Sequence, residues 1–459
     1  MTSASGRGHL LDDPRPVWRV LFIFLIPLML SNLLQGLSST ASAIYLGRLI
    51  GVHALAAVSA IFPIIFLLVS FIIGLASGST VLIGQAYGAR DNDKLKTIAG
   101  TTLTLTVLLS IVVGGLGGLL AEPLLSALGT PADILPASAS YCRIVFYTMP
   151  VLFVYLIYTT FLRGTGDAKT PMYALVLSTI LILAITPFFI LGWLGLPKLG
   201  INGAAVANVV ANVLSLGAML AYLARIKHPL AFDGAMLRHL RIDWPLAWTI
   251  TRIGVPTGLN LIMVSLSEIA VLSFVNRFGS TATAAYGAVN QIVSYVQFPA
   301  ISIGIAVSIF GSQAIGAQRL ERIPQIVRSG VVLNYAIEGV LIGIVYLFSY
   351  HVISLFIIEP ATAAIAQRLL HITLWSYVIF GNARVLSGLM LSSGAVVWPT
   401  LISIASIWAV EVPVAYVLMK RIGLDGVWYG YPAAFIAGLL MQLTYYKLFW
   451  KKRPLRRLV

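Results

Sequence analysis

Three acidic residues, Glu268, Glu338 and Glu411, stand inside long apolar stretches of the second half of this chain. By residue count each falls near the middle of its stretch. A charged group at the centre of a bilayer costs about 2.5–3.5 kcal/mol or more, so such residues are usually functional and face a cavity or a partner. A carboxyl there can bind and release a proton, and an ionised carboxylate can hold Na⁺. We therefore expect these three residues to couple to an ion, with Glu268 as first choice and Na⁺ as an alternative ligand at Glu268.

Each acid also has a structural alternative. Glu268 can serve as a hydrogen-bonding carboxyl, and Glu338 has Asn334 one helical turn away, which favours a structural role. Glu411 is followed by Pro413, and a proline interrupts helix hydrogen bonding and can expose carbonyl oxygens. A further span carries Arg384. Because a buried guanidinium needs an acidic partner, we expect it to pair with Glu411 or Glu338.

Polar residues recur at steps of three or four in two other apolar stretches, which places them on one face of a helix. The stripes are Asn32, Gln35, Ser39 and Ser42, and Asn290, Ser294 and Gln297. Packing between helices is the alternative role for such stripes. A third stripe, Asn208, Asn212 and Ser215, has small residues nearby, and we expect it to pack. The predicted substrate cavity is lined by Asn32, Gln35, Ser39, Ser42, Asn260, Asn290, Ser294, Gln297 and Arg384.

Other chemistries lack the residues they need. The histidines are scattered without metal-ligand spacing, and no Gly-x-x-x-x-Gly-Lys phosphate loop occurs. No cluster of His, Asp or Cys residues that would suit a membrane-embedded enzyme is present. We therefore expect neither an enzyme nor a resident cofactor. Aromatic residues can stack on flat cations, and the candidates are Tyr155, Tyr158, Tyr286, Tyr295, Trp375 and Tyr377.

The composition fixes the surroundings of these residues. Hydrophobic residues make up 59% of the chain, charged residues only 10%, and the mean hydropathy is +0.94. Soluble domains carry about 25% charged residues. Apolar runs of about 20 residues span a bilayer as helices. The predicted fold is an all-α polytopic membrane protein with twelve transmembrane helices, centred near residues 30, 67, 108, 151, 183, 213, 264, 297, 338, 380, 409 and 438.

Basic residues determine the predicted orientation. They crowd the N-terminal segment, the connections that follow the second, fourth, sixth and eighth spans, and the tail, and they are sparse on the other side. The positive-inside rule then places both termini in the cytoplasm of a cell (inner) membrane protein. These flanks account for the net charge of +15. No basic domain stands outside the membrane, so the expected partners are the lipid bilayer and a small molecule, and nucleic acid is excluded.

The two halves of the chain repeat one another. The segment Gly84–Ala89 returns as Ser312–Ala317, a shift of 228 residues between Gln85 and Gln313. Such repeats are typical of transporters. We expect two pseudo-symmetric six-helix bundles of the same orientation. The predicted parts are an N-terminal segment at 1–16, an N-lobe at 17–224, a cytoplasmic linker at 225–248, a C-lobe at 249–449 and a basic tail at 450–459.

Ordered local motifs carry a family resemblance. The turn Phe161–Pro171 joins two spans, with glycines that permit the turn and Asp167 placed to cap the next helix. Together with the repeated Gly-Gln-Ala-x-Gly-Ala pattern, Asn32–Gln35 and Leu46–Arg48, it closely resembles the multidrug and toxic compound extrusion (MATE) family over about residues 17–450. The resemblance implies a two-lobed, V-shaped bundle with a substrate cavity between the lobes that opens alternately to each side. It also implies export of small, often cationic and aromatic compounds in exchange for protons or sodium ions. We expect the protein to be a monomer.

The chain departs from the family's pattern in its first half. Many prokaryotic relatives carry aspartates where this sequence has Ser42 and Thr186, and no acid lies inside the first six spans. Glu268, in contrast, is similar to the span-seven glutamate of many relatives. Two alternatives therefore stay open beside ion-coupled antiport. One is a flippase for lipid-linked saccharides, and the other is an uncoupled facilitator.

Overall fold

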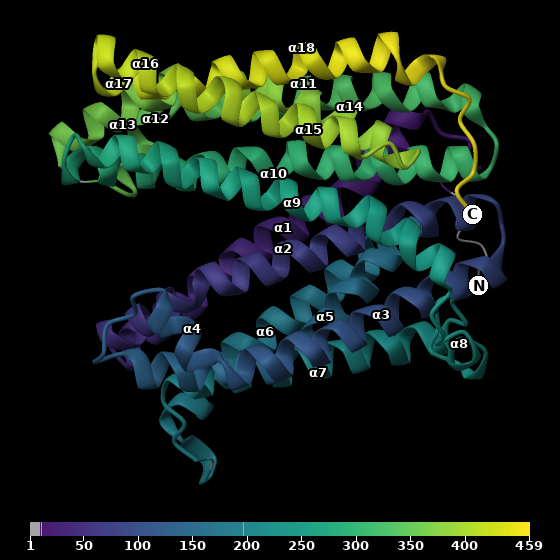
Figure 1. Ribbon diagram of the computed structural model, residues 1–459, viewed down its shortest axis with the longest axis horizontal. Coiled ribbons are helices and arrows are strands. Elements are labelled where there is room, and N and C mark those ends of the chain that lie inside the picture. The colour runs from purple at the N-terminus through teal and green to yellow at the C-terminus, as the bar shows by residue number, and fades with distance from the viewer. Residues whose placement is uncertain (1–9, 11, 196, 358) are drawn as a thin grey trace. The chain divides into compact units, whose positions relative to one another are not determined.

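The computed structural model describes residues 10, 12–195, 197–357 and 359–459. In this part of the chain the regular elements are all helices (Figure 1). Each of the twelve predicted span centres lies in a helix, and eleven helical segments are long and apolar enough to cross a membrane. The prediction of an all-α polytopic membrane protein is confirmed.

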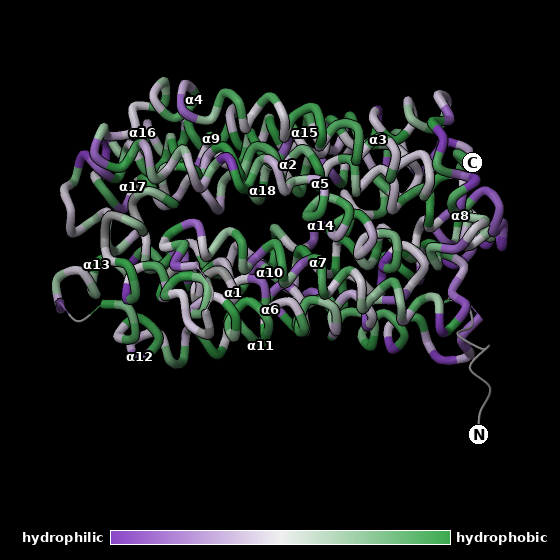
Figure 2. Tube along the Cα trace, turned by 90° about the horizontal axis from the view of Figure 1, so that it is seen from below, coloured by the Kyte–Doolittle hydropathy of each residue, from purple (hydrophilic) through white to green (hydrophobic). Residues whose placement is uncertain are grey.

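The twelfth predicted span corresponds to α18 (Gly430–Leu448). With 19 residues this helix is long enough to cross a membrane, but polar residues such as Gln442, Thr444 and Lys447 lower its hydropathy. The side chain of Gln442 is buried, and its amide donates a hydrogen bond to the carbonyl oxygen of Pro399 at 3.2 Å. This polar side chain therefore faces protein. Elsewhere hydrophobic residues follow the helices, and hydrophilic ones gather near helix ends (Figure 2).

The chain forms two compact units. Among the described residues, unit 1 comprises Leu30–Gly254, and unit 2 comprises those up to Met29 together with Val255–Val459. This division differs from the predicted lobes, because the beginning of the first span groups with unit 2. The predicted linker at 225–248 groups with unit 1 and contains the short helix α8 (Gly234–Arg238).

Two long helices, α1 (Val17–Leu49) and α9 (Trp244–Asn276), are each divided between the units. Each contains a proline next to the division, Pro27 in α1 and Pro256 in α9. Proline removes a backbone donor and clashes with the preceding turn, which favours a bend at that point. The first long helix of each repeat therefore contains a proline next to the division between the units.

Contacts within each unit show why the division falls there. In unit 2 the ring of Phe24 packs edge-on against Phe310, with ring centroids 5.6 Å apart. In unit 1 the backbone of α9 approaches α2 so closely that a Cβ on Gly254 would lie 2.8 Å from the carbonyl oxygen of Gly74. The first turns of each divided helix are thus held by the unit to which they are assigned.

The helices of unit 1 pack mainly on α5, which contacts α2, α3 and α7, while α6 packs on α7. Their bounds are α2 (Val52–Gly88), α3 (Asn92–Leu119), α4 (Ala121–Ala127), α5 (Leu135–Gly164), α6 (Lys169–Leu191), η1 (Trp193–Gly195) and α7 (Ile201–Arg225). The amide of Asn212 on α7 donates to Asn208 at 2.7 Å and accepts from the hydroxyl of Ser178 on α6 at 3.1 Å. The third polar stripe therefore packs helices together, as predicted.

The turn between α5 and α6 has the predicted cap. The Asp167 carboxylate accepts hydrogen bonds from the backbone N–H groups of Lys169 and Thr170, both at 3.1 Å. It also accepts from the Thr170 hydroxyl at 2.6 Å. These bonds satisfy donors at the start of α6 that have no partner inside the helix.

In unit 2 the central helix is α10, which packs on α11, α13 and α14, and α14 also contacts α18. The bounds are α10 (Ser280–Gly316), η2 (Leu320–Arg322), α11 (Ile323–Leu347), α12 (Ser349–Ser354), α13 (Pro360–Thr373), η3 (Leu374–Ser376), α14 (Tyr377–Ser392), α15 (Val397–Ala405), η4 (Ser406–Glu411), α16 (Val412–Ile422), α17 (Leu424–Trp428) and η5 (Trp450–Lys452). A Cβ on Gly388 would lie 2.2 Å from the carbonyl oxygen of Gly304. The backbones of α10 and α14 therefore touch.

Candidate functional site

The eleventh span contains a π-helical segment, η4, between α15 and α16. The N–H of Val412 donates to the carbonyl of Ile407, five residues earlier. Pro413 explains the wider turn, because its ring excludes the usual contact with the carbonyl four residues before it. Glu411 ends this segment and is 4% exposed. Short π-helical segments are frequent at functional sites.

Helix α9 is fixed beside this segment by two hydrogen bonds. The indole N–H of Trp408 donates to the Met263 carbonyl at 3.3 Å, and the Ser403 hydroxyl donates to the Asn260 side chain at 3.4 Å. The predicted cavity residue Asn260 therefore lies on the face of α9 that meets the eleventh span.

Glu268 lies on the same helix, and its carboxyl interacts electrostatically with that of Glu411. The side chain of Glu268 is exposed. The buried face of α9 carries Ser267 and Val271, and Glu268 is turned about 100° from Ser267 around the helix. The structure thus brings two of the three predicted acids together, one buried and one accessible.

Tyrosines surround the two acids. The hydroxyls of Tyr286 and Tyr431 are hydrogen-bonded at 2.9 Å, and Tyr286 stacks on Trp428 with centroids 5.8 Å apart. Tyr286 and the buried Tyr377 both interact electrostatically with Glu268 and Glu411. The acids therefore sit beside aromatic faces and hydroxyl groups, which suit cations in two ways.

The second polar stripe reaches the same cluster from α10. Asn290 hydrogen-bonds with the Tyr286 hydroxyl, and Gln297 hydrogen-bonds with the Tyr377 hydroxyl. The Ser294 hydroxyl donates a hydrogen bond to the backbone carbonyl of Asn290 at 2.8 Å. The amides of this stripe thus hold the tyrosines that surround the acidic pair.

Glu338 belongs to a separate place in unit 2. It is 0% exposed, on α11, beside Asn334, whose amide donates to the carbonyl of Val378 on α14 at 3.0 Å. The expected pairing of Arg384 with Glu338 or Glu411 is wrong, since Arg384 forms no ion pair within the described residues. Its guanidinium lies 5.8 Å from the ring centroid of Phe380, and the aromatic face takes the place of an acid.

The first polar stripe lies on the part of α1 that belongs to unit 1. Asn32 and Ser42 are half-buried and Gln35 is exposed, while the Ser39 side chain lies outside the described residues. The hydroxyl of Ser42 donates a hydrogen bond to the Ser38 carbonyl at 3.0 Å. Thr186 is buried and bonds its own helix at Ile182 in the same way, at 2.5 Å. At these two positions, where the family pattern has aspartates, this chain has hydroxyl groups that form hydrogen bonds within their own helix.

Sequence reasoning missed two parts of the acidic cluster. Tyr431 and Trp428 were not singled out, because aromatic residues are common in membrane proteins and nothing in their spacing points to Tyr286. The wide turn before Pro413 was anticipated only as interrupted hydrogen bonding. The signal that could have found it is the acid two residues before a proline inside an apolar run.

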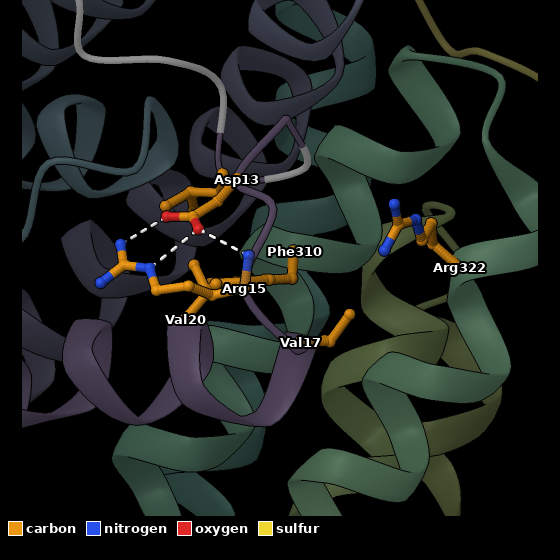
Figure 3. A pocket seen from close by; sticks show the side chains of 7 residues that line it. Asp13, Arg15, Val17, Val20, Phe310 and Arg322 are labelled. Carbon is orange, nitrogen blue, oxygen red and sulfur yellow. Dashed lines mark hydrogen bonds and ion pairs between the residues drawn. The ribbon is translucent and has the colours of Figure 1, made fainter.

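A small surface pocket occurs elsewhere in unit 2, where the N-terminal segment meets α10 and η2 (Figure 3). Asp13 holds Arg15 there through its backbone N–H at 3.0 Å and its Nε at 2.8 Å. Asp12 forms an ion pair with Arg319 at 2.9 Å. The pocket is lined by Leu10, Asp13, Arg15, Val17, Val20, Phe310 and Arg322, so it includes none of the predicted site residues.

Known proteins with the same architecture give these features their context. The family model described as MatE matches residues 27–188 and 256–417, once in each repeat. A Bacillus subtilis relative, "Probable multidrug resistance protein YoeA", is 53% identical over 445 residues, covering 96% of each chain. A second Bacillus subtilis relative, "Probable multidrug resistance protein YpnP", is 28% identical over 432 residues, covering 94% of this chain and 95% of its own. The crystal structure of the Vibrio cholerae MATE transporter VcmN superposes with a TM-score of 0.87 at 20% identity, covering 95% of this chain and 98% of that chain.

The family match over both repeats and the names of these relatives make the chain a transporter and not an enzyme. The chain belongs to the MATE family of multidrug efflux transporters.

Proposed function

We propose that this transporter exports small organic compounds, in particular cationic aromatic ones, in exchange for protons or sodium ions. The observation that carries the proposal is the pair of Glu268 and Glu411, which interact with one another beside Tyr286 and Tyr377. Its relatives named as multidrug resistance proteins support the substrate class.

The acidic pair explains how exchange arises. Two neighbouring carboxylates repel one another in a medium of low dielectric, so a bound cation is stabilised there. A proton or Na⁺ satisfies the pair, and so does the positive charge of an organic substrate stacked on the tyrosines. Because both ligands use the same charges, binding of one weakens binding of the other. This competition is what an antiporter needs in an alternating-access cycle.

The remaining residues take supporting roles in the proposal. Asn290, Ser294 and Gln297 orient the tyrosines and contact substrate, and Asn260 does so from α9. Asn32, Gln35, Ser39, Ser42 and Arg384 contribute to the substrate path. The protein acts as a monomer in the cell (inner) membrane. Both termini lie in the cytoplasm, as the distribution of basic residues favours.

The test is uphill transport of ethidium in proteoliposomes under a pH gradient or a sodium gradient. We expect one gradient to drive accumulation in the wild type and neither to do so in Glu268→Gln or Glu411→Gln. The matched control is Glu122→Gln, which replaces an acid that forms an ion pair with Arg143 at 3.1 Å in unit 1. Accumulation that survives in both pair variants would contradict the assigned ion site. Movement that only reaches equilibrium in the wild type would favour a facilitator.

A further inference from the structure

The carboxyl of Glu338 is enclosed where α11 packs on α14. Glu338 and Asn334 are each 0% exposed, and neither oxygen of the Glu338 carboxyl has a hydrogen-bond partner among the described residues. An ionised carboxylate enclosed without a partner is strongly unfavourable, because its lost hydration is not replaced. The carboxyl therefore needs either a neighbouring positive charge or a bound proton.

The neighbouring amide supplies an acceptor. Asn334 donates through Nδ2 to the Val378 carbonyl at 3.0 Å, which determines the orientation of its amide group. Its Oδ1 then points elsewhere and has no donor within the described chain. A Cβ on Gly381 would lie 2.0 Å from this oxygen and 2.6 Å from Oε2 of Glu338. Two acceptor oxygens thus lie next to one another with no donor between them.

The described helices that pack against α11 place no charged group in an ion pair with the Glu338 carboxyl. Helix α10 contains no charged residue, and Arg384 of α14 packs on Phe380. Within the described chain no ion pair involves Glu338. The titratable groups on the elements that pack against α11 are Tyr286, Tyr295, Glu321, Arg322, Tyr350, His351, Tyr377 and Arg384.

We propose that Glu338 carries a proton, which it donates to Oδ1 of Asn334, and that this is a second proton site of the transporter. The site is distinct from the Glu268–Glu411 pair. One proton removes the charge of the carboxylate and gives Oδ1 of Asn334 a donor, since a protonated carboxyl is a donor and an ionised one is not. The role in transport rests on the proposed exchange function, but protonation of Glu338 does not.

Infrared spectroscopy of the purified full-length protein tests protonation directly. A protonated carboxyl has a carbonyl band separate from those of carboxylates and amides. We expect a component of this band near neutral pH in the wild type that is lost in Glu338→Gln and kept in Glu268→Gln, Glu411→Gln and Glu122→Gln. Asn334→Ala should shift the band, because its hydrogen-bond acceptor is removed, and this variant covers the case in which Glu338→Gln fails to fold. A band unchanged in both Glu338→Gln and Asn334→Ala would overturn the proposal, and so would the absence of any band from the wild type.

A second measurement tests the role in transport. A pH indicator in weakly buffered solution counts the protons released when ethidium binds. We expect Glu338→Gln to release about one proton fewer than the wild type and still to bind ethidium, whereas a structural carboxyl would leave the count unchanged. An unchanged count beside a Glu338 infrared band would overturn the second transport site alone. Failure of the proposed exchange function would show instead as absence of uphill transport in the wild type.

Discussion

The hydroxyl oxygens of Tyr286 on α10 and Tyr431 on α18 lie 2.9 Å apart, in a hydrogen bond next to the acidic pair. This bond links two helices through tyrosines that are 145 residues apart in the chain. It also orients the hydroxyl of Tyr286, which interacts electrostatically with both Glu268 and Glu411. The bond therefore joins the packing of unit 2 to the chemistry of its site.

Tyr431→Phe removes this bond and keeps the ring. A hydrogen bond contributes about 0.5–1.5 kcal/mol net, so we expect the affinity for the coupling ion to fall roughly two- to tenfold. The measurement is the ion concentration that half-saturates ethidium transport. Tyr350→Phe, at an exposed tyrosine, is the control. An unchanged half-saturating concentration would mean that the bond has no part in ion binding.

The acidic pair predicts coupling between its members. Because the two carboxyls interact, the effects of Glu268→Gln and Glu411→Gln on ethidium binding should not add. Neighbouring residues in a cycle of single and double variants show interaction energies of about 0.5–3 kcal/mol. Binding titrations of the wild type, both single variants and the double variant give this energy. Additive effects would show that the two acids act independently.

The wide turn in the eleventh span gives a third prediction. Pro413→Ala restores a backbone donor, so we expect η4 to shorten toward α-helical hydrogen bonding and to rotate Glu411 away from Glu268. Transport should fall while the unfolding temperature stays equal or rises. An experimental structure of the variant checks the turn itself. Pro360→Ala is the control, because Pro360 begins α13, where no helix hydrogen bond is missing. Full transport with a relaxed turn would remove η4 from the mechanism.

Much of this architecture could be predicted because it depends on local composition. Apolar runs of bilayer length locate the helices, and Asp167 caps its helix through bonds to residues only two or three positions away. The partner of Arg384 could not be predicted, since Phe380 offered an aromatic face one turn away on the same helix. The exposure of Glu268 depends on the rotation of α9, which neighbouring helices set.

The pairing of acids shows the same limit. Glu268 and Glu411 interact because α9 is bonded to the eleventh span through Trp408 of the π-helical segment and Ser403 of α15. Glu338 lies elsewhere although its residue types and depth look alike in the sequence. Depth along a helix can be read from residue counts, but the face that meets a neighbour depends on tertiary packing.

The N-terminal segment of unit 2 allows a prediction about pH. Hydrogen bonds from Arg15 lower the pKa of Asp13 from its usual value to about 2. A lowered pKa means that the bond stabilises the fold above the unfolded value of about 3.9, and that this contribution is lost as pH falls through about 2. We expect hydrogen-exchange protection of residues 12–20, corrected for the intrinsic rate, to be constant between about pH 5 and 8. Asp13→Asn should lower it at every pH in this range. A loss of protection near pH 5 in the wild type would contradict the assignment.

The contact of α10 with α14 predicts the largest effect on stability. A Cβ at Gly388 would lie 2.2 Å from the carbonyl oxygen of Gly304, and this neighbour is backbone, which cannot rotate away. We expect Gly388→Ala to force the helices apart and to destabilise unit 2 by about 1–3 kcal/mol, seen as a lower unfolding temperature in detergent.

Gly343→Ala on α11 is the matched control, since no atom lies within 4 Å of its Cβ position. There, alanine should be neutral or should stabilise the helix by up to about 1 kcal/mol. Because α14 also carries Val378 and Gly381, the separation should weaken the Asn334 bond and shift the Glu338 infrared band in Gly388→Ala alone. Equal unfolding temperatures for the two variants would show that α10 and α14 are not in backbone contact.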